Sequence, residues 1–173
     1  MDKILNELEL DIIDLQLLDA LQHDASISNQ ALAEKVHVSP PTCLRRIKRL
    51  RELGLIETQV ALLSSDALAR LQGFGLTVLV EVSLERQGAE ALDAFEALVV
   101  ASDHVQQCWR VSPGPDFVLV VYAHDMPAYL AMAQRLFTSQ ANVRNVKAYF
   151  ATKRSKFVTR IPIQKGPHLT HVQ

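Results

Sequence analysis

Residues 28–56 read SNQALAEKVHVSPPTCLRRIKRLRELGLI and carry more information about the structure than any other part of the chain. Its pattern predicts two short helices joined by a tight turn. The second helix has a clear start, because Ser39 is a good N-cap and Pro40 suits the first position of a helix. Gly54 predicts where that helix ends, since a residue without Cβ is preferred just past a helix C-terminus. Residues 55–63 are rich in β-forming side chains and predict a small wing.

The predicted second helix is amphipathic, with a basic outer face. At about 100° per residue, Cys43, Ile47 and Leu50 fall on one stripe that can pack on the preceding helix, and Leu44 flanks this stripe. The outward positions are Pro41, Thr42, Arg45, Lys48, Arg49 and Glu52, and Arg46 lies at the edge. The basic side chains therefore lie mostly on the face that packing leaves free.

Two interpretations of this basic face are open. A run of charges is usually a solvated helix surface. The context favours a helix that enters the major groove of DNA, because helices predicted at Glu9–His23 and Asn29–Val36 and the wing complete a winged helix–turn–helix. The candidates for base edges are then Thr42, Arg45 and Arg49. The candidates for phosphate contacts are Arg46, Lys48 and the helix start at Ser39, Pro40 and Pro41.

Length and composition bound the other possibilities. The chain has 173 residues, which is enough for one medium domain or two small ones, and 49% of them are hydrophobic, which is enough to form a core. No apolar run approaches the roughly 20 residues of a membrane span, and the N-terminal sequence MDKILNELELDI lacks the features of a signal peptide. We therefore expect a cytoplasmic protein. Cys43 and Cys108 are expected as reduced thiols in different domains rather than as a disulfide or a metal pair.

The charges are distributed unevenly along the chain. Residues 1–64 carry 7 Lys/Arg and 10 Asp/Glu, residues 65–125 carry 3 and 9, and residues 126–173 carry 8 and 0. The acidic middle and the basic end can pair within a subunit or across an oligomer. Alternatively, the basic end is a second contact surface for DNA phosphates.

The second half of the chain alternates strands and helices. Strands are predicted at residues 74–84, 105–111, 117–123 and 143–152, and helices at 88–102 and 125–139. This β–α–β–β–α–β order is typical of a ferredoxin-like fold, in which a four-stranded antiparallel sheet has both helices on one face. The other face is open to a partner subunit. Residues 156–163 are expected to add an edge strand.

At this point the chain resembles the Lrp/AsnC family of bacterial and archaeal regulators, over roughly residues 8–163. Ser39 to Leu50, followed by Gly54-Leu55-Ile56, is similar to the family signature S-P-x-x-C-x-x-R-[IV]-[KR]-R-L…G-[IVFL]-I. The positions similar to the family's opening helix are Leu10-Asp11, Asp14, Leu18 and Leu21. The β–α–β–β–α–β order resembles the family's effector and oligomerisation domain.

The fold class expected is therefore α+β, in two domains. Residues 1–63 are the winged helix–turn–helix, and 64–73 are expected to form a linker or a short helix that joins the two domains. Residues 74–163 are the ferredoxin-like effector-binding and oligomerisation domain, and 164–173 form a loose tail.

The resemblance implies a sequence-specific transcriptional regulator and not an enzyme. It implies homodimers that join through their sheets and assemble to octamers, and a degenerate palindromic operator in double-stranded DNA. It also implies an amino acid or related metabolite as effector, bound between dimers; no other cofactor is expected. The alternative is a DNA-architectural, nucleoid-associated protein that needs no effector.

The candidates for effector contacts are Arg110, Ser112, Gly114, Asp116, Met126 and Phe150. A typical member of the family has a Gly-Asp-[Tyr/Phe]-Asp-[Tyr/Phe] turn between the second and third strands. Here the turn reads Ser112-Pro113-Gly114-Pro115-Asp116-Phe117, and its two prolines remove main-chain donors that could bind a carboxylate. Arg110 is expected to pair either with a ligand carboxylate or with Asp116.

No catalytic or metal-binding constellation is apparent in the sequence. It has no Ser/His/Asp or Cys/His arrangement and no phosphate-binding glycine loop. His168 and His171 form an H-x-x-H in the tail, and the other four histidines are scattered. We expect no catalytic residues and no metal ligands.

Overall fold

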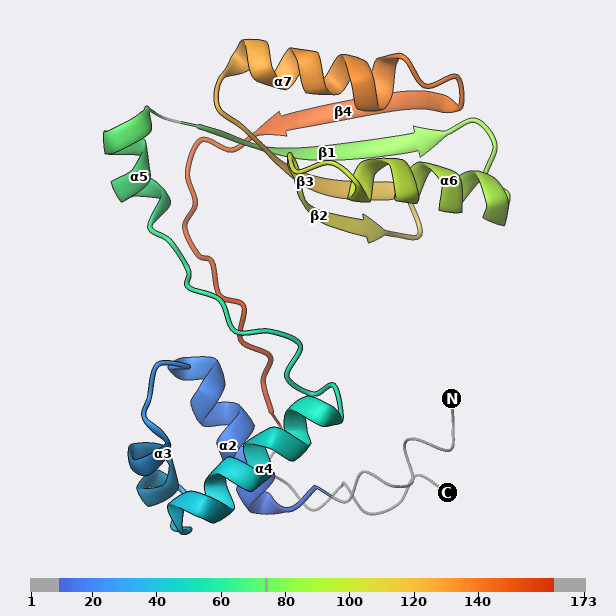
Figure 1. The fold of residues 1–173 in the computed structure, drawn as a ribbon. Helices are drawn as coiled ribbons and strands as arrows, with labels where there is room; N and C mark the ends of the chain where they lie inside the picture. The colour runs from blue at the N-terminus through green and yellow to red at the C-terminus, as the bar shows by residue number, and fades with distance from the viewer. Residues whose placement is uncertain (1–9, 74, 164–173) are drawn as a thin grey trace. The chain divides into compact units, whose positions relative to one another are not determined.

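A computed structural model describes residues 10–73 and 75–163 (Figure 1). Its elements, in chain order, are α2 (Ile12–His23), α3 (Asn29–Lys35), α4 (Pro40–Glu52), α5 (Ser65–Gln72), β1 (Leu76–Leu84), α6 (Ala89–Val100), β2 (Val105–Arg110), β3 (Phe117–Ala123), α7 (Met126–Ala133), the π-helix η1 (Gln134–Thr138) and β4 (Val143–Phe150). The described residues form two compact units. Residues 10–62 with 157–163 are the N-terminal unit, and 63–156 are the C-terminal unit. Within the described ranges, no helix is long and apolar enough to cross a membrane.

In the described part of the N-terminal unit, the helices α2, α3 and α4 surround the core. The stripe of α4 that was predicted to pack is buried, which confirms the helical phase. The buried residues of this core are Leu17, Ala20, Leu32, Ala33, Val36, Cys43, Ile47 and Leu50. A short turn joins α3 to α4 (Figure 1), and in it His37 adopts a φ of 56°. A residue other than glycine rarely takes this conformation, and the sequence gives no sign of it.

Both ends of α4 follow local signals. The Ser39 hydroxyl accepts a hydrogen bond from the N–H of Thr42 at 3.4 Å, as expected of an N-cap. At the other end, Gly54 has a φ of 71°. The N–H groups of Gly54 and Leu55 donate to carbonyls of the last turn of α4, at 2.9 and 3.0 Å. This pair of bonds is a Schellman motif, which ends the helix where the glycine predicts.

The predicted wing does not form as a strand. Residues 55–63 are all described and contain no strand, and the side chains of Val60, Leu62 and Leu63 are exposed. Residues with high β propensity form a strand only when they can pair with a neighbouring strand and pack against its side chains. Within the described N-terminal unit no strand is present to pair with this segment, so its β-forming side chains remain in water.

A segment from the far end of the sequence completes the N-terminal unit. Residues 157–163, which we call the C-terminal strap, belong with α2 and not with the sheet. The side-chain amide of Gln22 donates to the carbonyl of Ile161 at 3.1 Å and accepts from its N–H at 2.7 Å. Arg160 donates to Nε2 of His23. The predicted edge strand is therefore wrong, because the main chain of Ile161 pairs with a helix side chain instead of a strand.

We expect Gln22→Ala to release the strap and to leave the three helices folded. The variant removes two hydrogen bonds that contribute about 0.5–1.5 kcal/mol each. Amide protection in residues 157–163 should therefore fall by roughly tenfold, as measured by hydrogen exchange with mass spectrometry. Gln30→Ala is the control, since that amide donates to Glu34 on its own helix. Equal protection of the strap in both variants would contradict the assignment.

The C-terminal unit is a four-stranded sheet in the order β2-β3-β1-β4, with every neighbouring pair antiparallel. This is the ferredoxin-like order, and it confirms the prediction from the sequence. Alternate side chains of the two central strands point into the core, where α6 and α7 cover them (Figure 1). The core residues include Val78, Val80, Val82, Phe95, Val99, Phe117, Leu119, Val121, Tyr129 and Met132.

The opposite face of the sheet carries apolar side chains that no helix described in the C-terminal unit covers. The register places Leu79 opposite both Val120 and Tyr149, and Trp109 opposite Val118. Trp109 is 59% exposed and Tyr149 is 50% exposed. We call these five residues the open face. A contiguous apolar surface of this kind is typical of a site for another protein surface.

Candidate nucleic-acid interface and effector site

The structure separates the basic residues of α4 into two sets. Arg45 and Lys48 are exposed on the outer face of the helix, and Nζ of Lys48 lies 3.7 Å from Glu52. Arg46 and Arg49 lie on the flank that faces α2. At the start of the helix, Thr42 is half-buried and the exposed residues are Ser39, Pro40 and Pro41. The predicted DNA contacts therefore do not form one uniform surface.

A buried carboxylate holds the second set in place. Asp14 of α2 is 1% exposed. Its Oδ1 lies 2.9 Å from Nη1 of Arg46, and its Oδ2 lies 3.3 Å from Nη1 of Arg49. Arg46 also lies 2.8 Å from a carboxylate oxygen of Asp11. Since a buried charge is tolerated only when it is paired, these contacts fix α4 against α2.

Asp11 connects this ion-pair network to the start of α2. Its Oδ1 accepts hydrogen bonds from the N–H groups of Ile13 and Asp14 at 2.9 and 3.0 Å, and Asp14 accepts from the N–H of Asp11 at 3.3 Å. These reciprocal bonds are a capping box. Burial raises the pKa of Asp11, but the hydrogen bonds from Asp14 and Arg46 outweigh it, so that pKa is lowered. The pKa of Arg46 is raised, chiefly by its bond to Asp14.

These contacts show that two of the residues predicted to contact DNA also have a partner within the protein. Arg46 has a structural partner on α2, and Arg49 shares that partner. Arg45 lies at the centre of the outer face, opposite the buried stripe. Sequence reasoning missed the part that Asp14 plays. The only available signal was its spacing from the N-cap Asp11, which predicts a capping box but not the partners 32 and 35 residues away.

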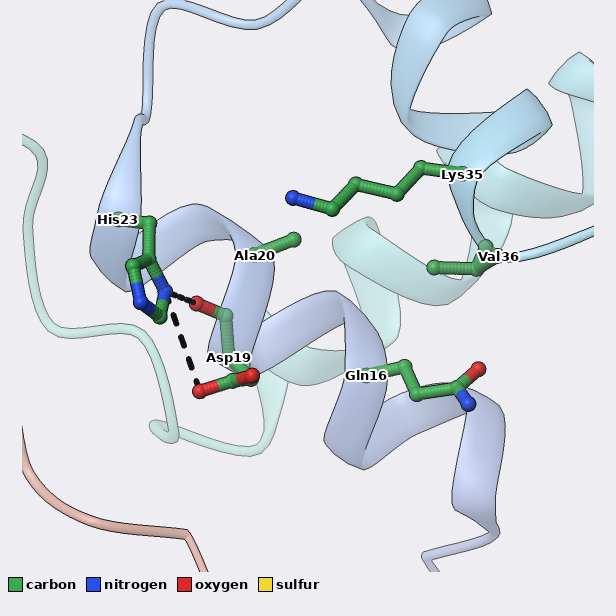
Figure 2. Close-up of a pocket in the computed structure, with 6 residues that line it drawn as sticks. All are labelled: Gln16, Asp19, Ala20, His23, Lys35 and Val36. Carbon is green, nitrogen blue, oxygen red and sulfur yellow. Dashed lines mark hydrogen bonds and ion pairs between the residues drawn. The ribbon is translucent and has the colours of Figure 1, made fainter.

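A hollow of about 260 Å³ lies on the N-terminal unit between α2 and α3 (Figure 2). Because a guanidinium can only donate, Nε2 of His23 accepts from Arg160. Nδ1 of His23 then carries the hydrogen and donates to the carbonyl of Asp19 at 2.7 Å. The lining residues are Gln16, Asp19, Ala20, His23, Lys35 and Val36, none of which is a predicted site residue. We therefore assign the hollow to neither DNA nor effector.

Among the effector candidates, Asp116 is already used by the fold. Its Oδ2 accepts from the N–H of Leu84 at 2.7 Å and from the side-chain amide of Gln87 at 3.3 Å. These bonds tie the turn between β2 and β3 to the end of β1. Ser112 and Gly114 are exposed in the same turn, where Gly114 has a φ of 122°.

The expected pairing of Arg110 with Asp116 is wrong. Arg110 lies 2.7 Å from Asp93 and also bonds to Glu96, both on α6. Its guanidinium carbon lies 5.6 Å from the centre of the Phe117 ring. The bond to Asp93 is the main reason that the pKa of Arg110 is raised. Helix α6 packs beside β2 and brings two carboxylates to the arginine, while Asp116 is held at the end of β1.

The last two effector candidates lie at the other end of the sheet. Phe150 is paired with Val78 near the start of β1, and Met126 begins α7 after β3 (Figure 1). Asp116 contacts Leu84 at the end of that strand. The steps from Val78 to Leu84 span about 20 Å at roughly 3.3 Å per residue. A single chain therefore does not bring all six candidates into one site of amino-acid size.

The described residues contain no cluster of three or more His, Cys, Asp or Glu that could hold a metal ion. His168 and His171 lie outside the described residues. Cys43 is buried in the N-terminal unit and Cys108 is half-buried in the C-terminal unit, and both thiols are free. Burial raises the pKa of both thiols.

Comparison with known families covers most of the described chain. The AsnC-type helix-turn-helix domain matches residues 10–51, and the Lrp/AsnC ligand binding domain matches residues 77–161. The chain is 34% identical over 155 residues to the leucine-responsive regulatory protein of Rhizobium meliloti, covering 90% of this chain and 97% of that protein. It is also 34% identical over 155 residues to the DNA-binding transcriptional activator DecR of Escherichia coli, covering 90% and 99%.

Solved structures have the same fold. An AsnC family transcriptional regulator from Agrobacterium tumefaciens superposes with a TM-score of 0.79 at 31% identity, covering 88% of this chain and 97% of that one. A transcriptional regulator from Neisseria meningitidis, solved in complex with L-methionine, superposes with a TM-score of 0.78 at 30% identity, covering 88% and 96%. These matches confirm the α+β architecture with an N-terminal helix–turn–helix.

Proposed function

Because the chain belongs to the Lrp/AsnC family of transcriptional regulators, we propose that it binds a palindromic operator as a dimer and that an amino acid or related metabolite controls its assembly. The family consists of regulators and not enzymes. The observation that carries the proposal is the basic outer face of α4, a helix that is fixed to α2 by the ion pairs of Arg46 and Arg49 with Asp14.

The structure of α4 supports a specific division of contacts to DNA. Arg45 is centred on the exposed face in the first half of the helix, the part that contacts base edges in helix–turn–helix complexes. An arginine there can bridge the two acceptors of guanine in the major groove. Lys48 and the helix start at Ser39 then bind phosphates, with Thr42 and Arg49 beside them. Arg46 contributes by holding the helix in place.

Arg45→Ala is expected to weaken binding to operators that the wild-type protein selects from random DNA. Loss of a bidentate arginine–guanine contact costs about 1–3 kcal/mol, which is roughly fivefold to 150-fold in affinity for each half-site. The measurement is a titration by fluorescence anisotropy at fixed salt, since phosphate contacts make affinity steeply dependent on salt.

Arg86→Ala is the matched control, because Arg86 is exposed in the C-terminal unit. It should bind the selected DNA as the wild type does. Failure of the wild-type protein to select any sequence would refute the proposed function. Unchanged affinity of a folded Arg45→Ala variant would refute the role of Arg45 alone.

The open face supports a dimer built through two sheets. Its residues come from all four strands and are apolar, and a two-fold axis would bring the same patch of each subunit together. The pair would then present two α4 helices to two half-sites, so the operator is expected to be a degenerate palindrome. We extend the proposal to assembly of dimers into octamers, around which DNA could wrap.

The relatives support an amino acid as effector. One is named a leucine-responsive regulatory protein, and a regulator of similar fold was solved with L-methionine. In this chain the candidate contacts occupy two ends of the sheet, Arg110 to Asp116 at one and Met126 with Phe150 at the other. A site between dimers can combine the two groups from different subunits. The effector would then shift assembly by binding one assembly state more tightly than the other.

The match to a ligand binding domain argues against the architectural alternative, in which no effector binds. We also propose that the protein is cytoplasmic, because a bacterial or archaeal regulator acts on DNA there.

A further inference from the structure

One apolar side chain on α4 is left in water. The sequence pattern suggests that Leu44 flanks the packed stripe, but its side chain is 60% exposed. Its neighbours in the stripe, Cys43 and Ile47, are buried. Leu44 therefore contributes little to the core of the N-terminal unit, and its side chain is available to a molecule that docks on the exposed face of α4.

The ion-pair network shows which part of α4 remains available to DNA. Arg46 and Arg49 are bonded to Asp14, so their flank of the helix faces α2. Leu44 is about 200° from Arg46 around the helix, which places it on the other flank. Pro41 and Lys48 lie three and four residues from Leu44 and therefore share this surface with it. Arg45 lies next to Leu44 on the same exposed side of the helix. The exposed surface is thus basic, with one apolar patch in its first half.

This combination matches one feature of the major groove. Thymine presents a C5-methyl group there, and proteins distinguish it by apolar contact. We propose that Leu44 determines specificity by contacting a thymine methyl group, next to the base that Arg45 contacts. The proposal rests on the proposed DNA-binding function, and it names an apolar base contact beside the basic ones. An exposed leucine is unfavourable in the free protein, and contact with a methyl group in the groove removes its surface from water.

The test is a cycle between a protein variant and a DNA variant. Operators are first selected from random DNA with the wild-type chain. Each thymine of the selected half-site is then replaced in turn by deoxyuridine, which removes only the methyl group. At one position in each half-site, the replacement should weaken wild-type binding by about threefold to fivefold per half-site. Leu44→Ala should lose a similar factor on the thymine operator and be insensitive to deoxyuridine at that same position.

Leu44→Ala is expected to fold, because it removes an exposed side chain and alanine favours helix. Leu71→Ala is the matched control, since Leu71 is 82% exposed on α5 in the C-terminal unit; it should keep the full sensitivity to deoxyuridine. Equal sensitivity of wild type and Leu44→Ala at every position would overturn the proposal. The same holds if no thymine methyl group affects wild-type binding, or if the Leu44→Ala defect appears in oligomerisation and not in DNA affinity. Failure to select any operator would instead refute the proposed function.

Discussion

Replacing Asp14 with alanine is expected to lower the free energy of unfolding of the N-terminal unit by about 3–5 kcal/mol. Asp14 is buried, and its two oxygens pair with Arg46 and Arg49. Its removal leaves the half-buried guanidinium of Arg46 short of a partner and also opens the capping box at Asp11. A loss of this size is a large fraction of the stability of a small domain.

Two probes can follow the two units separately. Trp109 is the only tryptophan in the chain and lies in the C-terminal unit, so its fluorescence follows that unit. Cys43 is buried in the N-terminal unit, so labelling of its thiol under denaturant follows unfolding there. Asp14→Ala should shift the Cys43 transition to lower denaturant and leave the Trp109 transition in place.

Two further variants make the test specific to the ion-pair network. Asp24→Ala removes an exposed acid just after α2, which accepts bonds from Ser26, and should cost about 1 kcal/mol or less. Replacing both Asp14 with leucine and Arg46 with methionine should recover much of the stability, because apolar side chains of similar size often substitute for a buried pair. An Asp14→Ala protein as stable as the Asp24→Ala protein would show that the network is dispensable.

Val120→Glu is expected to dissociate the proposed dimer. Val120 points outward from the central strand β3, between Leu79 on β1 and Gln107 on β2. In a two-fold interface it would bury two carboxylates without partners, at a cost of several kcal/mol. We expect the dissociation constant to rise by at least about 100-fold, which is roughly 2.7 kcal/mol. Sedimentation velocity at micromolar concentration would measure it, and operator affinity should fall because one half-site contact is lost.

Two comparisons separate this effect from misfolding. Ala94→Glu adds the same charge at an exposed position of α6, away from the open face, and should leave the dimer intact. Trp109→Ala removes a side chain that is 59% exposed, so it should weaken the dimer without unfolding the sheet. Folded Val120→Glu and Trp109→Ala proteins that sediment as the wild type does would place the dimer contact elsewhere.

Sequence reasoning succeeded where the determinants are close together in the chain. Ser39 and Gly54 fix the ends of α4 through bonds within a few residues. The sheet topology followed from the β–α–β–β–α–β order of the predicted elements, each of which was recognised from its own run of residues. The wing failed for the opposite reason, because a strand needs a partner and residues 55–63 have none in the described unit.

The candidate sites were harder to predict because their contacts join distant positions. Asp14 and Arg46 are 32 residues apart, and nothing in either local pattern indicates that they meet. Arg110 was expected to pair with Asp116 or with a ligand carboxylate, and only the packing of α6 brings Asp93 and Glu96 to it instead. The effector candidates were grouped by resemblance, and only the register shows that they lie at two ends of the sheet.

The C-terminal strap has a consequence for how this protein can be recombined with its relatives. A chimaera that exchanges residues 10–62 alone would combine a foreign α2 with the resident strap, and the pairing of Gln22 with Ile161 would be lost unless the donor chain supplied it. Transplanting the whole DNA-binding unit therefore takes two crossovers, one near residue 62 and one near residue 157. The residues of α2 that contact the strap should consequently be inherited together with the codons for residues 157–163, although the coding sequence of the sheet lies between them.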